Sequence, residues 1–232
     1  MIKTWWADLK RFPYVDIRWF LVWTFIYIGF LITDVIMPSF WGSSLLKYAG
    51  IFLCVVYASQ KNRHDYKLIL ALFFTFLADT ILVWTNNEIA GVFVFCFAQT
   101  MHFLRLTKLQ RKYLVMFTAI ISCGVIYAGV RQDNILYAIS ALYALLLISN
   151  LVVSFRRFME KKSDFHTRCA FYGFVAFLCC DLCVGFRHLM IDGALSATLL
   201  PLIAYLVWMF YYPSQVLLAN SSTKVAKNHS IS

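Results

Sequence analysis

Two aspartates lie deep inside apolar segments of this chain and limit what it can fold into. Asp79 lies within the segment ALFFTFLADTILVW, and Asp181 lies within GFVAFLCCDLCVGF. Placing a carboxylate in hydrocarbon costs about 2.5–3.5 kcal/mol or more. Such residues are kept where they face the protein interior and are neutralised or used. The two aspartates therefore predict a polar site inside a membrane protein.

The apolar residues are spread over the whole chain. Hydrophobic residues make up 62% of the sequence, against about 45–50% in soluble domains. They form blocks of about 15–22 residues, long enough to cross about 30 Å of hydrocarbon as a helix. The blocks lack the alternation of β-barrel strands. We therefore predict an all-α polytopic bundle with eight transmembrane helices, at 19–37, 45–59, 68–85, 89–105, 113–130, 135–154, 169–188 and 196–219.

The basic residues predict the orientation of this bundle. Most of the 21 lysines and arginines lie before the first span, in alternate loops and in the tail. Positive charge in short loops stays cytoplasmic, so both termini are expected inside and the number of spans is expected to be even. Residues 1–18 form a predicted cytoplasmic interfacial segment, 19–219 the transmembrane domain and 220–232 a polar cytoplasmic tail. The expected location is a bacterial inner membrane or an equivalent cellular membrane.

The positions of the charged residues and of the cysteines argue against nucleic acid and metal ions as partners. The net charge of +10 lies in loops that flank the spans, so it predicts contact with lipid headgroups and not with nucleic acid. The 7 cysteines lie in or beside apolar blocks, where free cysteine acts as a small hydrophobe. We expect no disulfide. A metal site or other cofactor is also not expected, because the cysteines around Asp181 lack histidine partners within the membrane.

Four polar residues are predicted to share one depth. Measured by helical rise from the nearest cytoplasmic basic residue, Asp79, Asp181, Tyr212 and Lys47 lie about 18–21 Å into the membrane. Lys47 could instead extend outward along its span to the interface, and Tyr212 could be a packing aromatic. Two neighbouring carboxylates in a low dielectric do not both ionise readily. One aspartate can then keep a proton while the other is charged, a division that suits acid/base chemistry.

Other polar residues lie nearer the predicted cytoplasmic side. His102 is about 5 Å from Arg105 along its helix, and Gln99 lies one turn deeper on the same face. His102 is interpreted as an interfacial or hydrogen-bonded histidine more readily than as a ligand. Gln215 follows Tyr211 by one turn on the last span. At the far end of the first span, Asp34 is expected at the interface.

Several motifs of the chain resemble the YhhN-type lysoplasmalogenase family. The resemblance covers most of the chain and is carried by Lys47, FLADTIL (76–82), Gly173-x-x-x-Phe177-x-x-x-Asp181-Leu and YYPSQVLLANS (211–221). Three positions depart from the family pattern. The chain has Ala78-Asp79 for Gly-Asp, Lys47-Tyr48 for Lys-Pro and Gln99-x-x-His102 for a fourth-helix His-x-x-Tyr.

The resemblance implies a membrane hydrolase. Its substrates would be lysoplasmalogens, lysophospholipids whose vinyl ether bond is cleaved to a fatty aldehyde and glycerophospho-ethanolamine or -choline. Asp79 and Asp181 would be the catalytic acid and carboxylate. Lys47 would pair with a carboxylate or the substrate phosphate. The residues that would bind substrate or water are Tyr211, Tyr212 and Gln215, with Gln99 and His102 as further candidates.

A second interpretation is a proton- or ion-coupled transporter or channel, since intramembrane aspartates also form ion sites and proton relays. Asp79 and Asp181 each lie on the third helix of a predicted four-helix half, as a parallel duplication would place them. A sensor or scaffold of unknown ligand is a third class. The sequence leaves the oligomeric state open.

Overall fold

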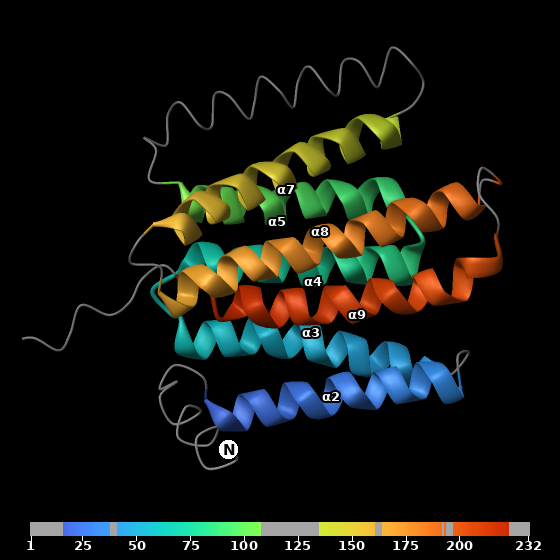
Figure 1. Cartoon of the computed structure of the whole chain (residues 1–232), viewed down its shortest axis with the longest axis horizontal. Helices are drawn as coiled ribbons and strands as arrows, with labels where there is room; N and C mark the ends of the chain where they lie inside the picture. Colours follow the sequence, from blue (N-terminus) through green and yellow to red (C-terminus); the bar gives the residue numbers. More distant parts are fainter. Residues whose placement is uncertain are drawn as a thin grey trace, which may run out of the picture. The chain divides into compact units, whose positions relative to one another are not determined.

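The computed structural model describes residues 16–37, 41–107, 135–160, 164–191, 193 and 197–222, and these residues form helices without strands. The elements are α2 (Ile17–Ile36), α3 (Trp41–Lys61), α4 (Tyr66–Thr85), α5 (Glu88–Leu106), α7 (Ile135–Met159), α8 (Phe165–Ile191), η1 (Ala197–Leu199) and α9 (Leu200–Ala219) (Figure 1).

The helices confirm the predicted all-α membrane class. Within the described residues, 7 helices are long and apolar enough to cross a membrane, and each coincides with one of the predicted spans. The predicted span at 113–130 lies outside the described residues. The total of eight spans and the cytoplasmic location of both termini stay predictions.

The chain divides into two compact units, Met1–Gly50 and Ile51–Ser232. The first unit contains α2 and the beginning of α3. The second contains the remainder of α3 and the helices α4 to α9.

Short polar side chains begin and end the helices of the second unit. Asp65 accepts a hydrogen bond from the Leu68 amide at the start of α4. The Asn87 side chain accepts from the Ala90 amide at 3.0 Å and caps α5. Between them, Asn86 has a φ of 50°, a left-handed conformation that asparagine tolerates better than most residues. These residues allow α4 to turn directly into α5.

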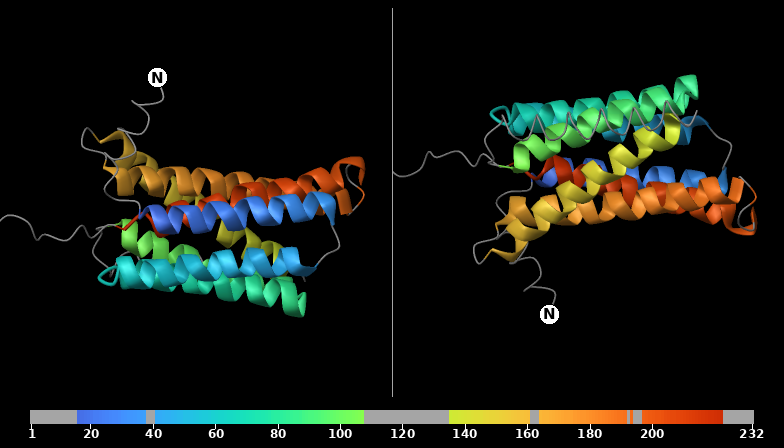
Figure 2. Two further views of the ribbon diagram at one scale, coloured as in Figure 1. Left: turned by 90° about the horizontal axis from the view of Figure 1, so that it is seen from below. Right: turned by 90° about the horizontal axis from the view of Figure 1, so that it is seen from above.

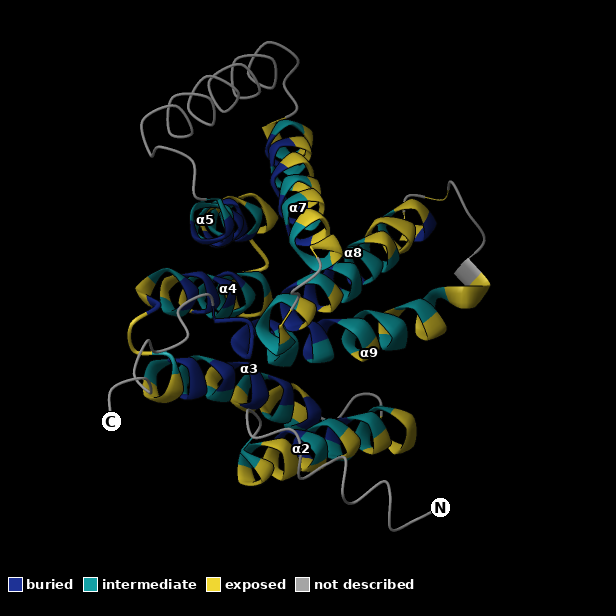
Figure 3. Cartoon of the chain, turned by 60° about the vertical axis from the view of Figure 1, so that its left-hand side comes forward, coloured by how far each residue is buried: buried dark blue, intermediate teal, exposed yellow. Residues whose placement is uncertain are grey.

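The second unit is built from two closely packed helix pairs joined by α7. Helices α4 and α5 lie side by side, as do α8 and α9, and α7 packs against both α5 and α8 (Figures 1 and 2). Residues on the faces that these helices turn toward one another are buried, and those on the opposite faces are exposed (Figure 3). Many of the exposed residues are large and apolar. This pattern is typical of a bundle whose outer surface meets lipid.

Two glycines allow the close approach within these pairs. A Cβ at Gly91 on α5 would lie 2.4 Å from the Leu82 side chain on α4. A Cβ at Gly173 on α8 would lie 2.9 Å from the Leu218 side chain and 3.3 Å from its backbone nitrogen on α9. Small residues at helix crossings are how membrane helices bring their backbones close together.

The end of α9 is held by polar groups from neighbouring elements. The Tyr57 hydroxyl donates to the Asn220 side chain at 2.8 Å, and the Asn62 amide donates to the Ala219 carbonyl at 2.9 Å. From α5, the Arg105 guanidinium donates to the carbonyl and hydroxyl oxygens of Ser221, each at 2.9 Å. Orphan carbonyls of a helix C-terminus are thereby satisfied.

We call this region of the second unit the basic end. It gathers the ends of α3, α5, α7 and α9 and the beginnings of α4 and α8, and it carries Lys61, Arg63, Lys67, Arg105, Arg156, Arg157 and Arg168. By the positive-inside rule, the basic end is expected to face the cytoplasm.

The crossing of α8 and α9 predicts a position-specific cost for added volume. Alanine at Gly173 must displace Leu218, and overpacking of this kind costs about 1–3 kcal/mol. Gly185, on the same helix, has nothing within 4 Å of the position that an added methyl group would take, so alanine there adds helix propensity alone. We expect Gly173→Ala to lower the melting temperature in detergent and Gly185→Ala to maintain or raise it. Equal melting temperatures would contradict the close crossing.

Candidate functional site

Asp79 is held by a tyrosine of the last helix. The Tyr211 hydroxyl on α9 donates a hydrogen bond to Asp79 Oδ2 on α4 at 2.6 Å. Tyr211 itself is buried and makes edge-to-face contacts with Phe177 and Trp208, at centroid distances of 5.6 and 5.5 Å. These two contacts fix the position of the Tyr211 ring and therefore the direction of its hydroxyl. The hydrogen bond from that hydroxyl in turn orients the carboxylate of Asp79.

Asp181 has an equivalent tyrosine partner on another helix. The Tyr143 hydroxyl on α7 donates to Asp181 Oδ2 on α8 at 2.7 Å. Sequence reasoning did not single out Tyr143. A signal was available, because Tyr143 lies seven residues before Asn150, and two polar residues two turns apart share one face of an apolar helix.

The two aspartate–tyrosine pairs are neighbours. Cys180 lies close to both Asp79 and Asp181, and Tyr211 lies close to Tyr143. We call Asp79, Asp181, Tyr143 and Tyr211 the carboxylate centre. It draws one residue from each of α4, α7, α8 and α9.

The Gly-x-x-x-Phe-x-x-x-Asp motif places three functions on one face of α8. Residues four apart lie one above the other on a helix. Gly173 admits Leu218 of α9, Phe177 packs on Tyr211, and Asp181 reaches Tyr143 on α7. The motif therefore sets the distance between α8 and α9 and presents the carboxylate.

The remaining candidates on α9 are buried but serve different neighbours. Tyr212 lies close to Cys54 of α3, so it faces α3. Gln215 is fully buried and donates to the Ser214 hydroxyl at 3.2 Å. The structure thus brings Tyr211 to the carboxylates and places Tyr212 on a different side of α9.

The α5 candidates lie inside the bundle. Gln99 accepts a hydrogen bond from the Asn150 amide of α7 through its side-chain oxygen at 2.9 Å. His102 has no exposed surface and stands edge-to-face on Phe174, with centroids 5.3 Å apart. Arg105, from which the depth of His102 was counted, is itself buried against the end of α9. The position of His102 relative to the membrane interface stays a prediction.

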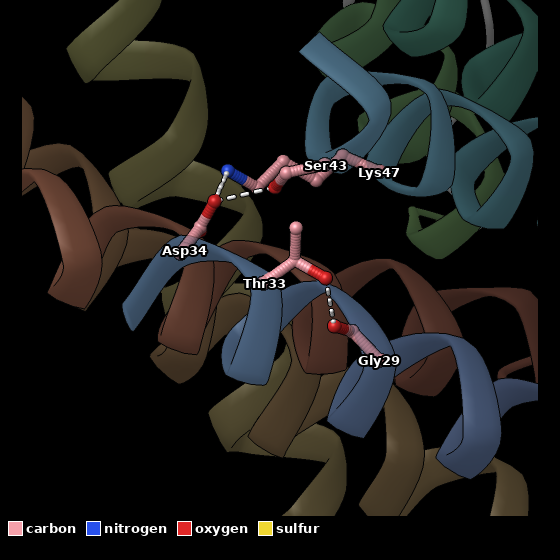
Figure 4. Close-up of polar contacts among 5 residues, drawn as sticks. All are labelled: Gly29, Thr33, Asp34, Ser43 and Lys47. Atoms are coloured by element: carbon pink, nitrogen blue, oxygen red, sulfur yellow. Dashed lines mark hydrogen bonds and ion pairs between the residues drawn. The ribbon is translucent and has the colours of Figure 1, made fainter. Parts of the chain in front are cut away.

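Lys47 is paired within the first unit. Its ammonium lies 2.7 Å from Asp34 Oδ2 and 5.6 Å from the centroid of the Phe30 ring, and Ser43 also donates to Asp34 (Figure 4). The structure turns Asp34 toward α3, and its expected place at the membrane interface stays a prediction. The reason is electrostatic, since a carboxylate and an ammonium that both leave water gain most by meeting.

Within the described residues, no group of three histidine, cysteine or acidic side chains could hold a metal ion. The six cysteines in these residues are free thiols, and Cys123 lies outside them.

Together the spans and the carboxylate centre define a polytopic helical membrane protein with an intramembrane acidic site. The YhhN family model matches residues 42–222, which include nearly all of α3, the helices α4 to α9 and the whole carboxylate centre. The protein belongs to the YhhN family. Membership is consistent with a membrane-associated function of the lysoplasmalogenase type. Comparisons with curated proteins and with solved structures give no match.

The pair between Asp34 and Lys47 predicts strong coupling between two substitutions. Lys47→Met leaves a largely buried carboxylate without its counter-ion, which costs about 3–5 kcal/mol. Adding Asp34→Asn removes that charge, so the double variant should melt at a higher temperature than Lys47→Met alone. The measurement is a double-mutant cycle of melting temperatures in detergent. Additive effects of the two substitutions would show that the ion pair contributes nothing.

Proposed function

We propose that this protein hydrolyses the vinyl ether bond of lysoplasmalogens and releases a fatty aldehyde and glycerophospho-ethanolamine or -choline. One observation carries the proposal: two aspartates within membrane spans, each oriented by a tyrosine hydroxyl, are neighbours in a YhhN family member. The substrate is an amphiphile that already resides in the bilayer, so a site inside the helical bundle suits it.

The reaction needs one protonated and one ionised carboxyl group. The protonated group transfers its proton to the β-carbon of the vinyl ether, whose π electrons form the new C–H bond. The adjacent carbon becomes an oxocarbenium ion, which the charged carboxylate stabilises. Glycosidases divide the work between two carboxyl groups around a similar cation.

Water completes the hydrolysis. The charged carboxylate accepts a proton from a water molecule as its oxygen bonds to the cationic carbon, which gives a hemiacetal. As the hemiacetal breaks its bond to the glycerol oxygen, the carboxyl group that took the proton from water gives it to that oxygen. The hemiacetal hydroxyl passes its own proton to the other carboxylate as the aldehyde C=O bond forms. One water is consumed, no proton is gained or lost, and each aspartate returns to its starting protonation state.

The tyrosines supply orientation and charge stabilisation. A phenol that donates to a carboxylate fixes the plane of the carboxyl group and favours its ionised form. Both hydrogen bonds use the Oδ2 atom, Tyr211 on Asp79 and Tyr143 on Asp181. We assign Oδ1 of each carboxyl the proton transfers and leave open which aspartate is the acid. We assign the side-chain amides of Gln99 and Gln215 the binding of substrate or water.

The transport alternative makes a different structural demand. Ion and substrate sites of many transporters are formed where helices are broken. Pro213 is the candidate for such a break, and α9 continues through it from Leu200 to Ala219. This continuity favours the hydrolase.

The first test measures aldehyde released from lysoplasmalogen by the purified protein. Asp79→Asn and Asp181→Asn should each lower kcat by about 10²–10⁴-fold, the usual contribution of a general acid or base. Thr80→Val is the matched control on α4, because the Thr80 hydroxyl only bonds to the Phe76 carbonyl of its own helix. Wild-type protein without aldehyde release but with bound ion or solute would favour transport.

The tyrosine partners generate a second prediction. Hydrogen bonds to charged groups contribute about 1.5–3 kcal/mol, so Tyr143→Phe and Tyr211→Phe should each reduce kcat/KM by about 10–100-fold. Tyr172→Phe, an exposed tyrosine of α8, should leave the rate unchanged. Full activity in both tyrosine variants would remove their assigned role even if the aspartates prove essential.

A further inference from the structure

A line of buried polar side chains runs along α5 toward the basic end. Gln99, His102 and Arg105 follow one another at intervals of three residues, so they share one side of the helix. All three are buried, and Gln99 and His102 have no exposed surface. Arg105 holds Ser221 beyond the end of α9, whereas helix packing alone does not require polar side chains at Gln99 and His102.

Helix α7 carries a matching line. Asn150 lies two turns after Tyr143, and Ser154 lies one turn after Asn150. Both Asn150 and Ser154 are fully buried. The Asn150 amide donates to both the backbone and side-chain oxygens of Gln99, each at 2.9 Å. Two polar faces of neighbouring helices are therefore in direct contact along the interior of the bundle.

These side chains leave polar atoms unsatisfied by protein. Within the described residues, buried atoms without a hydrogen-bond partner include Gln99 Nε2, both ring nitrogens of His102, Asn150 Oδ1, Arg105 Nε and Gln215 Oε1. A buried polar atom destabilises the fold if nothing bonds to it. Ordered water molecules supply hydrogen bonds to buried polar groups that have no partner in the protein.

The polar line has a defined beginning and end. At one end the Gln99 side chain lies next to Tyr143, the partner of Asp181. At the other end Ser154 is part of a pocket at the basic end, which Arg157 and His166 also line. From Tyr143 to Ser154 the helix rises about 16 Å, so the line crosses the depth that separates the carboxylate centre from that pocket.

We propose that water molecules occupy this line and connect the pocket at the basic end with the carboxylate centre. Gln99, His102 and Asn150 hold the chain of water by the atoms that protein leaves unbonded. If the proposed hydrolysis is correct, each turnover consumes one water deep in an apolar bundle, and this path supplies it. That role rests on the proposed function, whereas the presence of water does not.

The test is X-ray hydroxyl-radical footprinting of the full chain in lipid nanodiscs, read by mass spectrometry. The X-rays generate hydroxyl radicals from water molecules next to a side chain, so the oxidation rate reports local water. The measurement does not depend on enzymatic activity. His102 and its neighbour Phe174, both fully buried, should be oxidised several-fold faster than Phe73 and Phe93, which face outward in the apolar spans. Equal rates at the buried and outward-facing residues would overturn the proposal.

A blocking variant tests the path. Asn150→Leu should reduce oxidation of Tyr143 and Phe177 several-fold and leave His166 in the pocket unchanged. Ser149→Leu is the matched control, because the Ser149 hydroxyl bonds only to the Leu145 carbonyl of its own helix. Unchanged oxidation at Tyr143 in Asn150→Leu would overturn the path.

The comparison of buried with outward-facing residues in the wild-type protein tests the presence of water even if the blocking variant does not fold. Aldehyde release is measured on the same samples, which separates the two proposals. Strong oxidation of His102 without any aldehyde release would support the water path and contradict the proposed hydrolase function. Aldehyde release with His102 no more oxidised than Phe93 would do the reverse.

Discussion

A carboxylate inside an apolar bundle must be given a hydrogen-bond donor, and this requirement connects the helices of the second unit. Asp79 ties α4 to α9 through Tyr211, and Asp181 ties α8 to α7 through Tyr143. Each bond joins residues far apart in sequence, so it forms only when the bundle is assembled. Because hydrocarbon offers no substitute partner, the acidic site and the packing around it depend on each other.

The close packing of α8 on α9 serves this acidic site. Gly173 lets Leu218 approach, and Phe177 one turn later supports the ring of Tyr211. At the basic end, Arg105 secures Ser221, the second residue after the end of the same helix. A helix held at its end and along its side keeps the Tyr211 hydroxyl at one depth, which positioned proton transfer requires.

Much of the fold was predictable, and the site was predictable in part. Long apolar blocks and their basic flanks located every described span, since bilayer thickness leaves few other solutions. Asp79 and Asp181 stood out because their cost in hydrocarbon is large. Tyr143 did not, because an aromatic residue in an apolar helix is ordinary. The burial of His102 and Arg105 inside the protein was not predictable, because it depends on which helices pack against α5.

The sequence by itself determined the class of protein, the spans and the two acidic residues, because hydrophobicity and the cost of a buried charge are properties of single residues and segments. Tertiary structure decided which hydroxyl meets which carboxylate, that Lys47 pairs with Asp34, and that the polar faces of α5 and α7 meet. Those choices depend on the rotation and spacing of helices, which arise from contacts such as that of Gly173 with Leu218 and cannot be read from one helix alone.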